Sequence, residues 1–264
     1  MNPLAAAVLA GLLGLRVGSF ANVVIDRTAG GQSVVWPTWR CPACGVPAVM
    51  RDSLPVAGWL LLRGRCRSCR QPISVRYPLV ELAMGMVWFA VTLRLAGESL
   101  GWAVPAYLAL AFVCLVLTVI DATTHLLPNR VTYPSFPLIA GLLLVASVAL
   151  GDVGRLGRGM LAAVAVGAFF LLLALISPRG VGAGDCKFAP TLGLALGWLS
   201  WGAVAVALVA AFLLSGLAGL AAMLLMRLPR KTLVPFGPWL AAGGLLAIMA
   251  GGKVAGWFGH AVLG

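Results

Sequence analysis

The chain has 264 residues, of which 61% are hydrophobic and only 10% are charged, and its mean hydropathy is +1.03. Because soluble domains carry about 25% charged residues, this composition excludes an ordinary soluble domain and indicates that lipid is the main solvent. The net charge of +12 does not indicate a nucleic-acid-binding protein, since most basic residues lie between apolar segments, as they do in the cytoplasmic loops of membrane proteins.

Eight apolar segments predict the membrane spans of an all-α polytopic protein. In chain order they cover residues 4–25, 79–95, 102–120, 131–150, 160–176, 188–201, 203–226 and 234–257. The first has neither the basic start nor the small-residue cleavage site of a signal peptide, so we expect it to remain as a span. The sixth is short and contains Pro190, which leaves its bounds open.

The distribution of Lys and Arg predicts the topology. When the loops are assigned alternately to the two sides of the membrane, one side holds fourteen of these residues and the other holds four. The positive-inside rule then places the amino terminus outside and residues 26–78 in the cytoplasm. We therefore expect three parts: a first span (residues 1–25), a cytoplasmic cysteine-bearing insert (26–78) and a transmembrane bundle (79–264).

The insert contains two C-x-x-C pairs, Cys41/Cys44 and Cys66/Cys69, with 21 residues between them. Two such turns supply four thiolates for a tetrahedral Zn²⁺ site, although this spacing slightly exceeds the usual one. Disulfides or four reduced thiols are the alternatives. A cytoplasmic location disfavours disulfides, and so small a segment usually needs a metal to fold, so these four cysteines predict a zinc site.

Two aspartates stand out at the predicted cytoplasmic boundary of the spans. Asp121 ends the third span, and Asp185 precedes the sixth, directly after the small residues 180–184, which would let another backbone approach. Taken singly, Asp185 could be a helix cap and Asp121 a solvated residue. Their shared depth instead predicts an acid–base pair that holds one proton near neutral pH. We expect His125 to be a polar anchor and Lys187 a topology charge.

Several motifs occur in order along nearly the whole chain. They are Gly18–Ile25 (GSFANVVI), the two cysteine pairs, Leu60–Cys66 (LLLRGRC), Arg76–Leu82 (RYPLVEL), Ile120-Asp121 with Leu127-Pro128, and Gly182–Lys187 (GAGDCK). Together they resemble the motifs of the type IV prepilin leader peptidases, which are membrane aspartic peptidases of the GxGD kind. The chain has Thr123 and Asn129 where members of that family often have further acids, so Asp121 is the carboxylate left in its segment.

The resemblance implies that Asp121 and Asp185 are catalytic, one activating water and the other protonating the leaving amine. It implies a bacterial inner-membrane enzyme that removes the basic leader of prepilins or pseudopilins at the cytoplasmic face, after a Gly. It also implies methylation of the new amino terminus by S-adenosylmethionine, with the zinc-bearing insert, Glu81 and Gly85 associated with that step. The chain has no Gly-rich nucleotide-binding fingerprint, so the methyl donor is implied by resemblance alone.

Other functions remain open at this point. The carboxylates could line an ion path in a transporter or a zinc-sensing membrane protein, or the chain could be a GxGD protease with non-pilin substrates. Transporters place ionisable groups near the membrane midplane, whereas these acids map to span ends, which favours the peptidase. The expected partners are the prepilin or pseudopilin substrate and membrane lipid, without nucleic acid, and the oligomeric state is not predicted.

Overall fold

A computed structural model describes residues 2–29, 41, 44–46, 54–124, 127–177, 182–225 and 236–263, with residues 29 and 251–263 described by their backbone. The chain divides into two compact units, Met1–Ser99 (unit 1) and Leu100–Gly264 (unit 2). This division has a single boundary, so the three-part division expected from composition stays a prediction. The described residues are mainly helical, and an isolated β-bridge joins Arg65 to Pro72.

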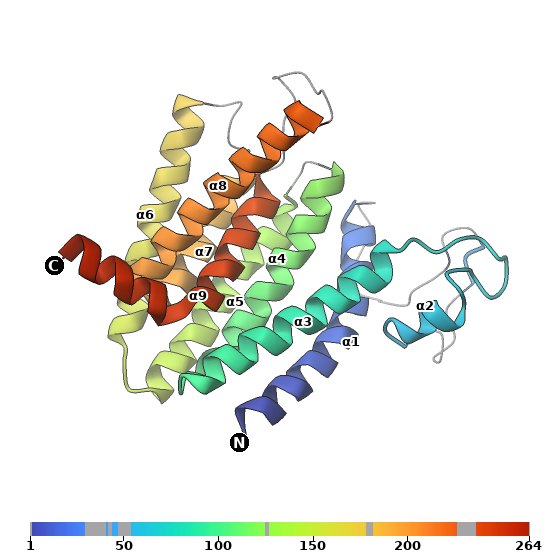
Figure 1. The fold of residues 1–264 in the computed structure, drawn as a ribbon, viewed down its shortest axis with the longest axis horizontal. Coiled ribbons are helices and arrows are strands. Elements are labelled where there is room, and N and C mark those ends of the chain that lie inside the picture. The colour runs from blue at the N-terminus through green and yellow to red at the C-terminus, as the bar shows by residue number, and fades with distance from the viewer. Residues whose placement is uncertain are drawn as a thin grey trace. The chain divides into compact units, whose positions relative to one another are not determined.

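The predicted all-α architecture is confirmed (Figure 1). Unit 1 contains α1 (Pro3–Ala29), α2 (Ala57–Leu61) and α3 (Arg76–Gly97). Unit 2 contains the 3₁₀ helix η2 (Gly101–Ala103) followed by α4 (Val104–Thr124), α5 (Asn129–Ala149), α6 (Gly154–Ile176), α7 (Ala183–Leu199), α8 (Trp201–Leu225) and α9 (Gly237–Leu263). Within the described residues, every predicted span lies mainly on one long helix.

The count of eight spans is not confirmed. Among the described residues, six helices are long and apolar enough to cross a membrane, namely α1, α3, α4 with η2, α5, α6 and α8. Helix α7 has 17 residues, and the described apolar part of α9 is also short, at Gly237–Ala250. The chain is therefore a multi-pass membrane protein, while its orientation stays a prediction because alternation of the loops depends on these two helices.

Glycines bring α1 and α3 together in unit 1. A Cβ atom at Gly14 would lie 2.9 Å from the carbonyl oxygen of Met84, and one at Gly18 would lie 2.6 Å from Cα of Glu81. Small residues let two membrane helices approach to backbone contact, where dispersion forces between them are strongest. The glycines of the first span therefore determine how closely α1 packs on α3.

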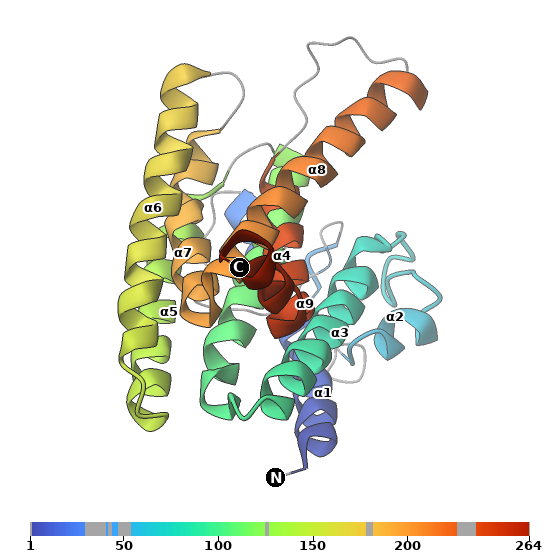
Figure 2. The same ribbon diagram turned by 60° about the vertical axis from the view of Figure 1, so that its left-hand side comes forward.

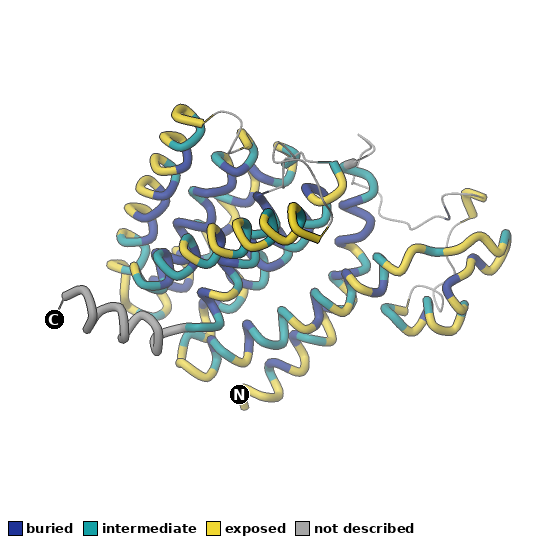
Figure 3. The backbone as a smooth tube through the Cα atoms, turned by 45° about the horizontal axis from the view of Figure 1, so that its top comes forward, coloured by how far each residue is buried: buried dark blue, intermediate teal, exposed yellow. Residues whose placement is uncertain are grey.

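Helix α7 is the most deeply packed element of unit 2. All of its residues from Thr191 to Trp198 are buried, whereas α6 and α8 each have an exposed outer side (Figure 3). Helices α6 and α7 lie side by side (Figure 2), and a Cβ at Gly193 would lie 2.7 Å from the carbonyl oxygen of Ala162. Because other helices surround it, α7 can be shorter than a lipid-facing span.

Hydrogen bonds from neighbouring helices fix the carboxyl end of α7. Arg158 of α6 donates to the carbonyl oxygens of Gly197, Trp198 and Leu199 at 2.7, 2.8 and 3.1 Å. The Tyr107 hydroxyl of α4 donates to the carbonyl oxygen of Ala195 at 2.6 Å. The Arg158 bonds satisfy carbonyls that a helix end leaves unpaired. Together with the Tyr107 bond, they fix the position of α7 against α4 and α6.

Candidate active site

The structure brings Asp121 and Asp185 together. Asp121 lies in the last turn of α4 and Asp185 in the first turn of α7, and they are 6% and 5% exposed. A Cβ atom at Gly237, the first residue of α9, would lie 2.6 Å from Asp121 Oδ2 and 3.5 Å from Asp185 Oδ1. The two carboxyl groups therefore border one point in unit 2, although helices α5 and α6 separate them in sequence.

Backbone groups hold both carboxylates. The Gly237 N–H donates to Asp121 Oδ2 at 3.1 Å, and the Gly182 N–H donates to Asp185 Oδ2 at 3.3 Å. Because the second bond joins the first turn of α7 to the residue before the helix, Asp185 also stabilises the start of α7. Among the described residues, Asp185 Oδ1 is buried without a hydrogen-bond partner. Unpaired buried polar atoms are rare and mark sites with a special role.

The glycines before Asp185 admit parts of the same chain. A Cβ atom at Gly184 would lie 2.6 Å from Cβ of Leu127, in the segment before α5. One at Gly182 would lie 3.2 Å from Asp185 Oδ2. The expectation that this run admits a substrate backbone stays a prediction, whereas the structure shows a packing reason for both glycines.

Gly237 lies outside the motifs that the sequence presents. Its one signal is the Gly237-Pro238 pair at the start of a predicted span, where proline favours the first turn of a helix. That signal predicts a helix start but no contact with Asp121, which lies 116 residues earlier.

Lys187 and His125 are the two other polar residues that the sequence places near the aspartates, and the structure describes only Lys187. Lys187 is exposed and donates to Asn129 Oδ1 at 3.0 Å, and its Nζ lies 5.5 Å from the ring centroid of Tyr133. Lys187 therefore links the first turns of α7 and α5, in addition to any effect on topology. His125 lies outside the described residues.

In unit 1, the two cysteine pairs adopt the same turn. In the first pair, the Cys41 carbonyl accepts from the Gly45 N–H at 2.8 Å, and the Cys41 N–H donates to the Val46 carbonyl at 3.1 Å. In the second pair, the Cys66 carbonyl accepts from the Arg70 N–H at 3.0 Å, and the Cys66 N–H donates to the Gln71 carbonyl at 2.8 Å. The residue after each second cysteine, Gly45 or Arg70, has a positive φ, 69° or 60°. The two pairs thus present their sulfurs in equivalent ways.

These turns gather the four sulfurs into a candidate metal site. All four Sγ atoms lie within 4.8 Å of one another. The Cys41–Cys69 and Cys44–Cys66 separations are 3.7 and 4.0 Å. A tetrahedral zinc ion with Zn–S bonds of about 2.3 Å needs sulfurs about 3.8 Å apart. The cluster can therefore hold a metal ion, and its sulfur separations far exceed a disulfide bond.

Glu81 and Gly85 both lie on α3, in contact with α1. The Glu81 carboxylate accepts from the Ser19 hydroxyl of α1 and from the Val56 N–H at 2.7 Å. A Cβ at Gly85 would lie 2.8 Å from Leu15 Cδ2. Glu81 thus joins α2 to both long helices of unit 1, and Gly85 permits their close packing. Their predicted association with methyl transfer stays a prediction.

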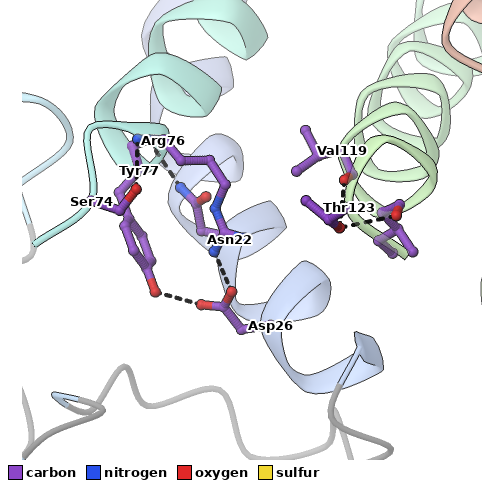
Figure 4. Close-up of polar contacts among 8 residues, drawn as sticks. Asn22, Asp26, Ser74, Arg76, Tyr77, Val119 and Thr123 are labelled. Atoms are coloured by element: carbon purple, nitrogen blue, oxygen red, sulfur yellow. Dashed lines mark hydrogen bonds and ion pairs between the residues drawn. The ribbon is translucent and has the colours of Figure 1, made fainter. Parts of the chain in front are cut away.

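A second polar cluster joins the ends of the two helices that flank the insert. Near the end of α1, Asp26 accepts from the Arg76 guanidinium and from the Tyr77 hydroxyl, the latter at 2.6 Å (Figure 4). Asn22 donates to the carbonyl oxygen of Tyr77 at 3.1 Å. These contacts explain the polar residues at the end of the first predicted span, because they close the base of the insert.

Comparison with known proteins assigns the family. The model of the bacterial peptidase A24 N-terminal domain matches residues 12–95, and that of the type IV leader peptidase family matches residues 108–224. A prepilin leader peptidase/N-methyltransferase of Aeromonas hydrophila is 34% identical over 276 residues, which cover 94% of this chain and 91% of the relative. A protein of the same name from Pectobacterium carotovorum subsp. carotovorum is 36% identical, with 92% of each chain covered.

No solved structure matches the chain. The family models and the relatives define a membrane peptidase, and the chain belongs to the type IV leader peptidase family. The resemblance seen in the sequence motifs is thereby confirmed. Asp121 and Asp185 both lie in the second matched segment, whereas the four cysteines and Glu81 lie in the first.

Proposed function

We propose that this protein is an aspartic endopeptidase that removes the basic leader of type IV prepilins or pseudopilins, with Asp121 and Asp185 as its catalytic residues. The observation that carries this proposal is the meeting of two buried carboxylates from α4 and α7 at the first residue of α9. The names of the relatives support the substrate class.

The reaction needs one ionised and one protonated carboxyl group. The ionised aspartate takes a proton from water while the water oxygen forms a bond to the scissile carbonyl carbon. The C–N bond breaks, its electron pair stays on nitrogen, and the protonated aspartate gives its proton to that nitrogen. Proton transfer between the carboxyl groups restores the starting state. Two adjacent carboxylates favour this shared proton, because both cannot easily ionise together.

The proposed function includes methylation of the new amino terminus with S-adenosylmethionine. The support for it is the name of the two relatives, prepilin leader peptidase/N-methyltransferase. Glu81 and Gly85 are the residues proposed for this step.

We assign the metal at Cys41, Cys44, Cys66 and Cys69 to zinc. Four cysteine sulfurs that lie this close to one another are typical of a structural zinc site, which has no open position for substrate. When bound, the ion supplies a cross-link between the two cysteine turns.

The proposed location is the bacterial cytoplasmic membrane, with the amino terminus outside and the aspartates at the cytoplasmic face. The support is the bias of fourteen Lys and Arg against four between alternate loops.

The test is cleavage of a membrane-embedded prepilin by the purified wild-type protein and by Asp121→Ala and Asp185→Ala. We expect the wild type to cleave and both variants to be inactive while remaining folded in the membrane. The mass of the new amino terminus, with and without S-adenosylmethionine, tests methylation. Full cleavage by either variant would contradict the assignment of the catalytic residues.

A further inference from the structure

Asp121 is held by a backbone group outside both aspartate motifs. The Gly237 N–H, at the start of α9, donates to Asp121 Oδ2 in a buried environment. The first N–H groups of a helix have no partner inside the helix, and they carry the positive end of its dipole. They are therefore suited to hold a carboxylate in one orientation.

The lack of a side chain at residue 237 lets the start of α9 lie close to both carboxyl groups. A Cβ there would lie 2.6 Å from Asp121 Oδ2 and 3.5 Å from Asp185 Oδ1. Asp185 is 5% exposed, and its Oδ1 has no hydrogen-bond partner among the residues that the structure describes. Because an unpaired buried oxygen is costly, this atom is suited to receive a hydrogen bond from water or from a peptide group.

The turn that presents Gly237 is anchored by aromatic packing. The ring centroid of Phe236 lies 5.2 Å from that of Phe212 on α8 and 5.8 Å from that of Phe170 on α6. The Phe236 carbonyl also accepts from the N–H of Trp239 and of Leu240, both at 3.0 Å. Contacts with two other helices of unit 2 therefore hold the residue directly before Gly237.

From these observations we propose that the Phe236–Gly237 turn is a third part of the peptidase site, in which Gly237 is a positioning residue. Its N–H orients Asp121, and its missing Cβ lets the backbone at the start of α9 approach that carboxylate without displacing it. This inference rests on the proposed peptidase function, and it adds a requirement that the two aspartate motifs alone do not contain.

The main test is the Gly237→Ala variant, with its kcat and KM for prepilin cleavage measured in the full-length protein. A displaced Asp121 carboxylate is expected to lower kcat on the order of 100-fold, as a misplacement of about 1 Å can do. KM should change by less than about twofold, because the interaction belongs to the transition state and not to substrate binding. The thermal unfolding midpoint in detergent should stay near that of the wild type.

Two glycine variants serve as controls. Gly141→Ala places the same methyl group in open space on α5, so it should cleave like the wild type. Gly244→Ala adds a methyl 3.0 Å from Leu192 Cδ2. It disturbs the packing of α9 away from the carboxylates and should retain kcat within about threefold. Phe236→Leu keeps Gly237 but removes the aromatic ring that packs on Phe170 and Phe212. This variant should lower kcat about tenfold at unchanged KM. It keeps the proposal testable if Gly237→Ala does not fold.

The outcomes separate this inference from the proposed function. If Asp121→Asn and Asp185→Asn are inactive but Gly237→Ala cleaves like Gly141→Ala, the inference is overturned and the peptidase assignment stands. A Gly237→Ala defect in KM alone, or one matched by Gly244→Ala, would also overturn it. Cleavage by the Asp→Asn variants would contradict the proposed function itself.

Discussion

At the scale of single residues, the candidate site depends as much on missing side chains as on the two carboxylates. Gly184 leaves room for Leu127, and Gly237 lets the start of α9 lie close to Asp121 and Asp185. The sequence identified the aspartates because ionisable residues are rare in so apolar a chain and are costly near lipid. It could not identify the contacts of the glycines, since a glycine has no side chain whose chemistry would indicate the group that packs against it.

Gly184→Ala is expected to reduce cleavage strongly. Its new Cβ would lie 2.6 Å from Cβ of Leu127, so the first turn of α7 must shift and carry Asp185 with it. A shift of about 1 Å predicts a loss on the order of 100-fold in kcat. The double variant Gly184→Ala/Leu127→Gly removes the collision and should recover part of that loss, whereas Gly219→Ala, in open space, should have no effect. Equal activity of all three variants would contradict this steric explanation.

At the scale of elements, α7 shows where patterns of hydropathy are insufficient. The sequence predicted a short and uncertain span over residues 188–201, whereas the helix covers Ala183–Leu199 and therefore includes the glycine before Asp185 and Asp185 itself. Its amino end is capped by the Asp185 carboxylate, which accepts from the Gly182 N–H, and its carboxyl end is bound by Arg158. The Arg158 contact could not be deduced from periodicity, because it joins residues 39 positions apart.

Arg158→Met is expected to destabilise unit 2. The change leaves three carbonyls at the end of α7 without the donors they have in the wild type. Loss of part-buried hydrogen bonds of this kind predicts a decrease of ~1–3 kcal/mol in the free energy of unfolding. Arg155→Met is the matched control, since Arg155 pairs with the exposed Asp152 and this surface pair should contribute little to stability. Thermal unfolding in detergent would measure both variants, and equal midpoints would contradict the capping role.

Removal of the metal is expected to affect methyl transfer more than cleavage. Cys66 lies in a hairpin in which the Ile73 N–H donates to Gly64 and the Trp59 indole N–H donates to Ile73, and Val56 at its base is bound to Glu81. Cys66→Ser should release zinc and loosen this connection, because four-cysteine sites of this size depend on the ion for folding.

The measurement is metal content by elemental analysis, together with cleavage and methylation assayed separately. Cys114→Ser is the control, since Cys114 is buried in α4 and takes no part in the cysteine cluster. Equal loss of both activities in Cys66→Ser would show that the insert serves folding in general.

At the scale of the whole molecule, each family match falls inside one compact unit. Residues 12–95 lie in unit 1, with the cysteine cluster and Glu81, and residues 108–224 lie in unit 2, with both aspartates. The residues proposed for the two chemistries therefore lie in different units, which gives a structural reason to expect that the two activities can be separated by mutation.

The topology can be tested with reporter fusions at the two ends of α6. A fusion after Asp152 follows α5, and a fusion after Ser177 follows α6, whose end leads to Asp185. If the amino terminus lies outside, alkaline phosphatase should be active at Asp152 and green fluorescent protein should fluoresce at Ser177, because each reporter works on one side of the membrane. The reverse pattern would place the aspartates on the outer face.

The sequence by itself determined the membrane environment, the long helices, the four clustered cysteines and the two aspartates that stand out. These features depend on composition and on local spacing, which are visible without knowledge of the fold. Only the tertiary structure decided that α7 is a short central helix, that Glu81 accepts from Ser19 and Val56, and that Gly237 completes the surroundings of the aspartates. Those features join residues from helices far apart in the chain, and such partners are selected by packing and by the pairing of buried polar groups.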